Sequence, residues 1–302
     1  YVYILQICKM TVKKIEINAD NAARRIDNFL ISLFPNIPKS KIYNIIRKGE
    51  VRANSSRIKP SYKLNLNDII RIPPNLHNTA NKIKKISDNK ILKHTKDILF
   101  ENENYIISNK RNDISVHAGS KNYIGLIDIF RKKFGGNIDL CHRLDKFTSG
   151  CIVFAKNKRA VKHFNKCLIT KEIQKKYCAI LKGSFNGHKI IDEPIYKNDK
   201  FKYKNSLSKF CFKQKLNKTT LVDIEIYTGR SHQIRIHALK LSHPIIFDKK
   251  YGDSNFDKYL NIGNHSIALH SKTIKFPDID NNIIEAKAEL SHSFKNLIEC
   301  LK

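Results

Sequence analysis

The sequence predicts an α+β protein in which a small basic module precedes a larger domain, built on a mainly antiparallel mixed β-sheet with flanking helices. Apolar residues recur at helical spacing in the first 74 positions, whereas short apolar or alternating segments typical of strands prevail from Ile98 onward. At 302 residues and 41% hydrophobic composition, the chain can bury a core. The predicted parts are an N-terminal extension (1–23), the module (24–74), a linker (75–96) and the large domain (97–302).

The module is expected to hold two short helices followed by two strands. The apolar positions at helical spacing are Ile26, Phe29, Leu30 and Leu33 for the first helix, and Ile42, Ile45 and Ile46 for the second. Ser40 is the expected N-cap of the second helix, and Gly49 is expected to end it in the left-handed conformation. Short strands are predicted at Val51–Ala53 and Ile69–Ile72.

Strands dominate the rest of the chain, beyond a Lys- and Asn-rich stretch at 75–96 that lacks periodicity. ILFENENYIIS (98–108) predicts a strand, a turn and a second strand, and CIVFA (151–155) predicts a buried strand. Three apolar residues that alternate with acids in 222–226 predict a half-buried strand. Further expected elements are a helix through Val161, Phe164 and Leu168 and strands at Tyr177–Leu181 and Phe210–Phe212.

Positive charge is the strongest compositional signal, with 57 Lys and Arg against 27 Asp and Glu and a net charge of +30. Such an excess implies a polyanionic partner, either nucleic acid or an anionic membrane surface. No apolar run approaches the roughly 20 residues of a transmembrane helix, and no signal peptide is evident. We therefore expect nucleic acid and no membrane partner.

Cysteine usage indicates a reducing compartment. The seven cysteines are odd in number and form no CxxC, so neither a disulfide framework nor a zinc site is predicted. The expected location is the cytoplasm. Because Met10 is the only methionine, translation is expected to begin there, with residues 1–9 as an upstream extension.

The stretch 39–63 carries eight cations and one acid, Glu50, for a net charge of +7. Cations near the start of a helix suit phosphate groups, because helix N–H groups and side chains then face the same anion. A solvated surface is the alternative, but this density of cations favours nucleic-acid contact. The eight are Lys39, Lys41, Arg47, Lys48, Arg52, Arg57, Lys59 and Lys63.

The module resembles an S4 domain, the small RNA-binding fold of ribosomal protein S4 and of several RNA-modifying enzymes. The likeness spans about 50 residues and includes RIDNFL, PKSKIYNIIRKGEVRAN and RIKPSYKLNLNDIIRIPP. It implies an RNA partner but no particular reaction. The predicted RNA contacts are Lys39, Lys41, Arg47, Lys48, Arg52 and Arg57.

Two segments of the large domain carry candidate chemistry. In CHRLDKFTSGCIVFAKN (141–157), Asp145 lies between Arg143 and Lys146, whose positive charge favours an ionised carboxylate. On charge pattern alone, a surface ion pair is favoured over a catalytic role. In TGRSHQIRIHALKLSHPIIFD (228–248), Ser231 is the expected cap of a helix that starts near His232. His232 and His237 are five residues apart and do not lie on one face of the helix, so no metal site is predicted.

These segments resemble the signatures of the RluA family of pseudouridine synthases. HRLDKFTSG is similar to HRLD-x-x-TSG, KKYCAI (175–180) to the tyrosine motif, GRSHQIRIH to GR-[ST]-HQ-[IL]-R-x-H, and VHAG (116–119) to the motif that precedes them. Their order agrees from about residue 20 to the C-terminus. The resemblance implies that uridines of large-subunit (23S) ribosomal RNA become pseudouridine.

The family's roles apply to the matching positions only. By resemblance, Asp145 is the catalytic aspartate, Arg235 the arginine that pairs with it, and Tyr177 the tyrosine that stacks on the base and helps to remove the C5 proton. Arg143 matches an arginine that fills the gap left by a flipped nucleotide. Two further RNA contacts are predicted in the third motif at Arg230 and Gln233.

One departure concerns the loop before VHAG, where the family usually has NKP-x-G. Here Arg111 and Asp113 replace the proline and the glycine, which removes a rigid turn. We therefore expect a looser loop at this position, whereas the catalytic motifs are intact.

The predicted reaction involves neither redox change nor net hydrolysis, so no cofactor, small-molecule or metal, is expected. We expect a monomer. Two alternatives remain open: a catalytically inactive S4-type RNA-binding protein, and a hydrolase that pairs Asp145 with His142. The latter has no Gly-rich nucleophile elbow to support it.

Overall fold

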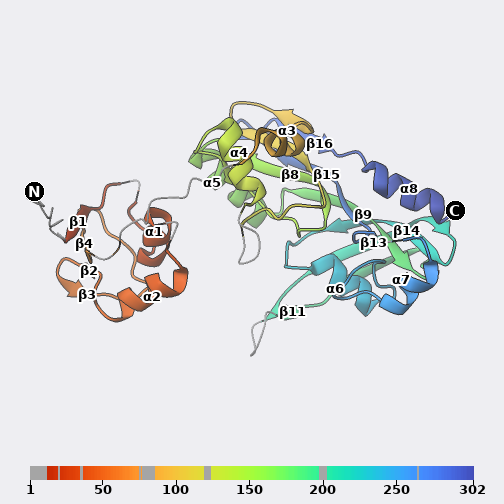
Figure 1. The fold of residues 1–302 in the computed structure, drawn as a ribbon, viewed down its shortest axis with the longest axis horizontal. Helices are drawn as coiled ribbons and strands as arrows, with labels where there is room; N and C mark the ends of the chain where they lie inside the picture. Colours follow the sequence, from red (N-terminus) through yellow and green to blue (C-terminus); the bar gives the residue numbers. More distant parts are fainter. Residues whose placement is uncertain are drawn as a thin grey trace, which may run out of the picture. The chain divides into compact units, whose positions relative to one another are not determined.

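A computed structural model describes residues 12–19, 21–34, 37–74, 76, 86–118, 124–196, 203–263 and 265–302. The chain forms two compact units, residues 1–85 and 86–302 (Figure 1). Predictions that concern residues 1–9 and Gly119 lie outside the described residues. Among the helices described, none is both long and apolar enough to cross a membrane.

The first unit combines two helices with a four-stranded antiparallel sheet of order β1-β4-β2-β3. Its elements are β1 (Lys13–Glu16), α1 (Ile26–Leu33), α2 (Lys39–Arg47), β2 (Arg52–Ala53), β3 (Ser56–Arg57) and β4 (Ile69–Ile72). The apolar faces predicted for both helices are confirmed, because Ile26, Phe29, Leu30, Ile42, Ile45 and Ile46 form one buried cluster with the strands. Gly49 ends α2 with φ of 74°, as predicted.

Two details of the first unit differ from the prediction. The supposed extension includes β1, which pairs with β4 from Lys13↔Ile72 to Glu16↔Ile69 and so belongs to the sheet. The N-cap of α2 is Pro38 and not Ser40; Pro38 makes no side-chain cap, and Ser40 lies within the helix. Proline immediately before the helix already fixes a favourable φ, so a serine cap is not needed there.

The second unit is built on one ten-stranded sheet. Its main path runs β10-β13-β14-β9-β15-β8-β6-β5, with β16 paired to β15 and β7 to β8. The strands are β5 (Ile98–Glu101), β6 (Tyr105–Lys110), β7 (Asp139–Leu140), β8 (Ser149–Ala155), β9 (Gln174–Lys182), β10 (His188–Asp192), β13 (Leu207–Leu216), β14 (Thr219–Ile226), β15 (Leu269–Pro277) and β16 (Ile283–Lys287). The ladder between β8 and β15 is parallel, and the other ladders described in this sheet are antiparallel.

Helices cover the sheet, and a separate hairpin extends from it (Figure 1). The remaining elements are α3 (Asp88–Thr95), α4 (Leu126–Phe134), α5 (Lys158–Ile169), α6 (Gln233–Lys240), α7 (Ser254–Leu260), α8 (His292–Cys300) and the hairpin β11 (Ile195–Tyr196) with β12 (Tyr203–Lys204). Helix α3 lies within the stretch predicted to be a linker, so that prediction is wrong for its second half. Its packing against α4 stabilises a helix that the polar local sequence does not indicate.

Strand β8 is the centre of this unit, because every one of its residues is buried. Ile152 and Phe154 pack into one apolar cluster, whereas Cys151 and Val153 pack into a second cluster on the opposite face. The predicted fully apolar strand is therefore confirmed, and its alternation serves two cores. This buried strand begins immediately after the loop that carries Asp145.

Candidate active site

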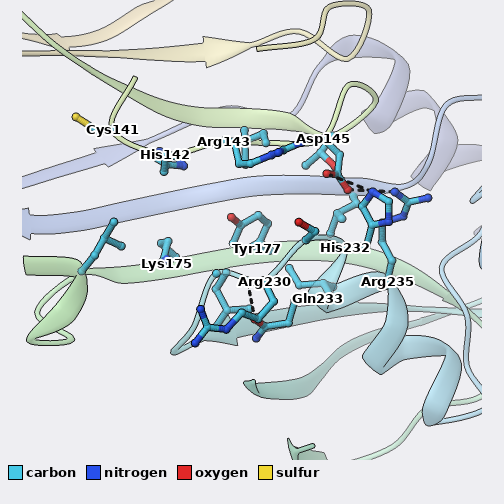
Figure 2. A pocket seen from close by; sticks show the side chains of 18 residues that line it. Cys141, His142, Arg143, Asp145, Lys175, Tyr177, Arg230, His232, Gln233 and Arg235 are labelled. Carbon is cyan, nitrogen blue, oxygen red and sulfur yellow. Dashed lines mark hydrogen bonds and ion pairs between the residues drawn. The ribbon is translucent and has the colours of Figure 1, made fainter. Parts of the chain in front are cut away.

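A pocket of about 240 Å³ opens beside Asp145 (Figure 2). Its walls come from the loop 141–148 before β8, from β9, and from the segment 229–235 at the start of α6. The motifs that lie far apart in the sequence therefore line one cavity. Figure 2 shows Asp145, His232 and Arg235 at one end of the pocket and Tyr177 between them and Lys175.

Arg235 joins two carboxylates. Its Nη1 donates a hydrogen bond to Oδ2 of Asp145 at 3.1 Å, so the predicted pairing across 90 positions is confirmed. The two-pronged contact, however, is made with Asp248: Nε donates to Oδ2 at 2.7 Å and Nη2 donates to Oδ1 at 2.6 Å. Arg235 therefore reaches Asp145 with one nitrogen only, because Asp248 occupies the other two donor nitrogens of the guanidinium.

Asp248 acts as the anchor for this arginine. Burial alone would raise its pKa, but hydrogen bonds from Arg235 and from the backbone N–H groups of Lys250 and Tyr251 outweigh burial and lower it. The Tyr251 ring also lies 5.0 Å from the guanidinium carbon of Arg235. With Asp248 charged and buried, Arg235 is held in one orientation from which it reaches Asp145 with a single nitrogen.

One oxygen of Asp145 remains available for a substrate. Oδ2 accepts from Arg235, while Nε2 of His232 lies 3.8 Å from Oδ1, beyond hydrogen-bond distance. Burial lowers the pKa of His232, so its imidazole is neutral at pH 7 and its Nδ1 is engaged with the Tyr251 hydroxyl at 3.0 Å. The carboxylate is 22% exposed and faces the pocket, as a nucleophile or base requires.

The start of α6 differs from the prediction. The N-cap is His232 and not Ser231, and it adopts a left-handed conformation with φ of 58°. This turn directs the His232 side chain toward Asp145, 3.8 Å away. A strained backbone at the site thus replaces an ordinary serine cap.

Tyr177 lies on β9 and is 6% exposed. Burial is the main reason that its pKa is raised to about 12, and the charge of Asp145 acts in the same direction. The phenol therefore keeps its proton at neutral pH. It can serve as a stacking surface and hydrogen-bond donor, whereas a phenolate base is disfavoured.

Lys110 fixes the loop that carries Asp145. Its buried ammonium donates hydrogen bonds to the carbonyl groups of Arg111, Lys146 and Thr148 at 2.8, 2.9 and 2.8 Å. Burial lowers its pKa to about 7, while three carbonyl acceptors favour the charged form. One side chain from the end of β6 therefore holds both ends of the segment 146–148.

The three predicted contacts Arg143, Arg230 and Gln233 all line the pocket, but they are not equivalent. Arg143 is exposed. Arg230 donates through Nε to the carbonyl of Asn205 at 3.1 Å and keeps the rest of its guanidinium available.

Gln233 does not fit its predicted role. Its Oε1 accepts from the Thr228 hydroxyl and the Arg230 N–H, and its Nε2 donates to Leu207 and Ser208. The amide is saturated and buried, so it positions the loop and has no group left for RNA.

The hydrolase alternative finds no support in the geometry. His142 Nε2 accepts the backbone N–H of Val153 at 3.1 Å, and burial lowers the pKa of this histidine to about 3. It is therefore engaged away from Asp145. In the described part of the chain, no three His, Cys, Asp or Glu side chains are grouped to hold a metal ion.

The sequence did not single out Asp248, Lys110 or Lys175 as functional residues. Asp248 ends the segment 228–248, directly after the apolar run PIIF, and an acid at that position is a signal that the sequence offers. Lys110 belongs to the altered NKP-x-G motif, whose lysine is kept. Lys175 opens the tyrosine motif.

Of the eight cations in 39–63, seven are exposed and Arg52 is partly buried. Arg52 donates to the carbonyl groups of Gly49 and Ser55, and Arg57 donates to that of Lys48. Within the described ranges, none of the eight forms an ion pair with an acid. Their charge is therefore left for an external anion.

Comparisons with known proteins agree with this geometry. The RNA pseudouridylate synthase family matches residues 104–240, and the S4 domain family matches residues 24–70. The fold resembles human RNA pseudouridylate synthase domain containing 4 (TM-score 0.59, 21% identity, 70% of this chain and 95% of that chain). It also resembles human RNA pseudouridylate synthase domain containing 1 (TM-score 0.53, 22% identity, 68% and 94%).

Relatives of similar length define the family further. Ribosomal large subunit pseudouridine synthase C of Haemophilus influenzae is 37% identical over 98% of this chain and 97% of its own. The protein of the same name from Buchnera aphidicola subsp. Acyrthosiphon pisum is 39% identical over 97% and 98%. The chain therefore belongs to the RluA-type RNA pseudouridine synthases with an N-terminal S4 domain, which are isomerases.

Proposed function

We propose that this enzyme converts specific uridines of large-subunit (23S) ribosomal RNA into pseudouridine, with Asp145 as the catalytic carboxylate. The observation that carries the proposal is the Asp145–Arg235–Asp248 arrangement inside a pocket of a pseudouridine synthase fold. The names of the full-length relatives support the choice of ribosomal RNA.

The reaction breaks the bond from C1′ to N1, turns the uracil and joins C1′ to C5. A uridine within a helix must first be flipped out, which costs roughly a few kcal/mol. Stacking on Tyr177 offsets about 1–3 kcal/mol of that cost. The Tyr177 ring forms a wall of the pocket between Asp145 and Lys175, which suits a stacked base.

Asp145 acts through the oxygen that Arg235 leaves available. It can attack C1′, add to C6, or take the proton from C2′ to give a glycal. In each route Arg235 offsets the carboxylate charge, and Asp248 keeps the arginine in place. The residues that position this chemistry are thus Arg235, Asp248 and Lys110, and no redox or hydrolytic cofactor is required.

RNA affinity is assigned mainly to the S4 module. Its unpaired cations release counterions from phosphates, which makes binding sensitive to salt. Arg143 and Arg230 supply contacts at the pocket itself. We infer a monomer located in the cytoplasm, where ribosomal RNA is available; the six described cysteines are free, in keeping with a reducing compartment.

Pseudouridine mapping in cells tests the proposal. Large-subunit ribosomal RNA from cells without the gene should lack specific pseudouridines that the wild-type gene restores and the Asp145→Asn gene does not. If the same pseudouridines persist without the gene, the proposed substrate is wrong. If Asp145→Asn restores them, the assignment of the catalytic carboxylate is wrong.

A further inference from the structure

Lys175 is a buried cation that has no partner among the described residues. It lies on β9 two residues before Tyr177, so both side chains point to the same side of the strand and line the pocket. The residue is 8% exposed. Its ammonium forms no hydrogen bond or ion pair with any described residue. Buried charges in proteins are normally paired.

The surroundings of Lys175 add positive charge. Burial and then the nearby charge of Arg230 lower the pKa of Lys175 to about 8. Lys175 in turn contributes to the lowered pKa of His142 on the opposite wall. The Lys175 Nζ also lies close to the loop at Gly229. A Cβ atom added to this glycine would be 3.5 Å from the Nζ.

The pocket as a whole has a strong imbalance of charge. Its lining contains one acid, Asp145, and four basic residues, which are Arg143, Lys175, Arg230 and Arg235. Arg235 already neutralises that acid. In Figure 2, Lys175 lies across Tyr177 from the Asp145–Arg235 pair, so one end of the pocket holds the reactive carboxylate and the other holds an unbalanced cation.

We propose that Lys175 binds a backbone phosphate of the nucleotide whose base stacks on Tyr177. This inference rests on the proposed function, because it takes a flipped nucleotide of RNA as the ligand. Lys175 then fixes the nucleotide from the phosphate side, while Asp145 reacts at the sugar or base. It is a binding and positioning residue, and it takes no part in bond making.

A phosphate fits this position better than a uracil carbonyl. A carbonyl is a neutral acceptor, so it offsets only part of the cost of burying an ammonium beside Arg230. A backbone phosphate carries a full negative charge, shared by two non-bridging oxygens, which attracts both adjacent cations far more strongly than a neutral carbonyl does. Two residues along a strand also span about 7 Å, which separates the ammonium from the stacking ring.

The first test compares Lys175→Met with Lys176→Met in the full-length enzyme. Lys176 is the matched control, since it is exposed, lies on the other face of β9 and is paired with Glu225 at 3.3 Å. Loss of a hydrogen bond to a charged group should raise the KM for RNA roughly tenfold to a hundredfold in Lys175→Met. The kcat at saturating RNA should change little, and Lys176→Met should match the wild type.

Thermal unfolding separates this role from a structural one. Removing an unpartnered buried charge should leave Tm unchanged or raise it, whereas loss of a structural contact would lower it. Lys175→Arg should recover most of the lost affinity. A fall in Tm or in kcat with unchanged KM, or an equal effect of Lys176→Met, would overturn the proposal.

The second test removes the charge from the RNA. A short RNA that contains a uridine modified by the wild-type enzyme is made with a neutral methylphosphonate on either side of that uridine. At one of the two positions the wild type should lose affinity, and Lys175→Met should lose no more. Additive losses at both positions would refute phosphate binding by Lys175. Failure of the proposed function is distinguishable, because the wild type would then form no pseudouridine in large-subunit RNA at all.

Discussion

The positive charges of the two units are arranged in opposite ways. In the pocket, Arg235 is held between Asp145 and Asp248, and each of its three nitrogens donates a hydrogen bond to a carboxylate oxygen. In the basic stretch 39–63, eight cations occur without an acid partner in the parts of the chain described. Paired charge in a partly buried site fixes geometry, whereas unpaired exposed charge provides affinity that salt weakens. We therefore expect substitutions in the Asp145–Arg235–Asp248 arrangement to change turnover and those in the stretch to change binding.

Arg235→Lys should give the largest effect among the supporting residues. A lysine keeps the charge but cannot hold Asp248 with two nitrogens while it reaches Asp145. Misplacing a reacting group or losing one preorganised donor costs about 10²- to 10³-fold in rate. Single-turnover pseudouridine formation should fall by that amount, with RNA affinity within a few-fold of wild type. A rate close to wild type would show that the guanidinium fork is not needed.

Tyr177→Phe should give the next largest effect. The pKa of the Tyr177 hydroxyl is raised to about 12, so this group stays protonated in the wild type. Phenylalanine keeps the stacking face and removes the hydroxyl. General acid–base assistance contributes roughly 10²-fold or more, and we expect a loss of about that size in turnover. RNA binding, measured by filter retention, should be near normal. Normal turnover would exclude the hydroxyl from proton transfer.

Substitution of Arg47, Lys48 and Arg52 by Ala should act on binding alone. Each lost phosphate contact reduces the slope of log affinity against log salt by about 0.7–0.9, so the slope should fall by about 2 or more. At saturating RNA, kcat should be unchanged. Affinity is measured over a series of salt concentrations.

The control for this triple variant removes three lysines from the second unit. Lys275, Lys287 and Lys295 lie near Glu285 or Glu289 and are already paired with acids. Their replacement by Ala changes the net charge equally and should alter the slope much less. Equal changes in both variants would mean that net charge, and not the stretch 39–63, determines RNA affinity.

The smallest expected effect is a pH dependence of RNA affinity. Burial and Arg230 lower the pKa of Lys175 to about 8 in the free enzyme, and a bound phosphate would raise it again. The contribution of Lys175 to RNA affinity should therefore be fully present well below pH 8. It should be lost as pH rises through 8, which lowers the affinity by up to about tenfold at pH 9.

The groups that face Lys175 should not titrate in this window. Burial lowers the pKa of His142 to about 3, raises the pKa of Tyr177 to about 12, and also raises the pKa of Cys141. Lys175→Arg should remove the pH dependence between pH 7 and 9. A dependence that persists in this variant must come from another group.

The sequence predicted the parts of the fold that local pattern determines. The stripes of α1 and α2, the buried run of β8 and the alternation in β14 follow from contacts that each segment makes with a nearby core. Pairings that depend on distant segments were missed. Strand β1 forms by pairing with β4, and α3 is stabilised by packing against α4. The residues of β1 and α3 alone do not indicate these distant partners.

The candidate site was predictable to the same degree. Motif resemblance identified Asp145, Tyr177 and Arg235, and the fold brings all three to one pocket. The division of Arg235 between two acids and the saturation of the Gln233 amide depend on tertiary hydrogen bonds that no spacing shows.

Asp145→Asn tests whether Asp145 performs the chemistry. Asparagine preserves size and polarity but cannot act as a nucleophile or base. The measurement is pseudouridine formation by the purified variant in a large-subunit RNA transcript, followed by tritium release from C5, with RNA affinity and Tm measured in parallel. We predict background turnover by a folded protein that binds RNA like the wild type. A folded, RNA-binding Asp145→Asn enzyme that still forms pseudouridine would contradict the claim.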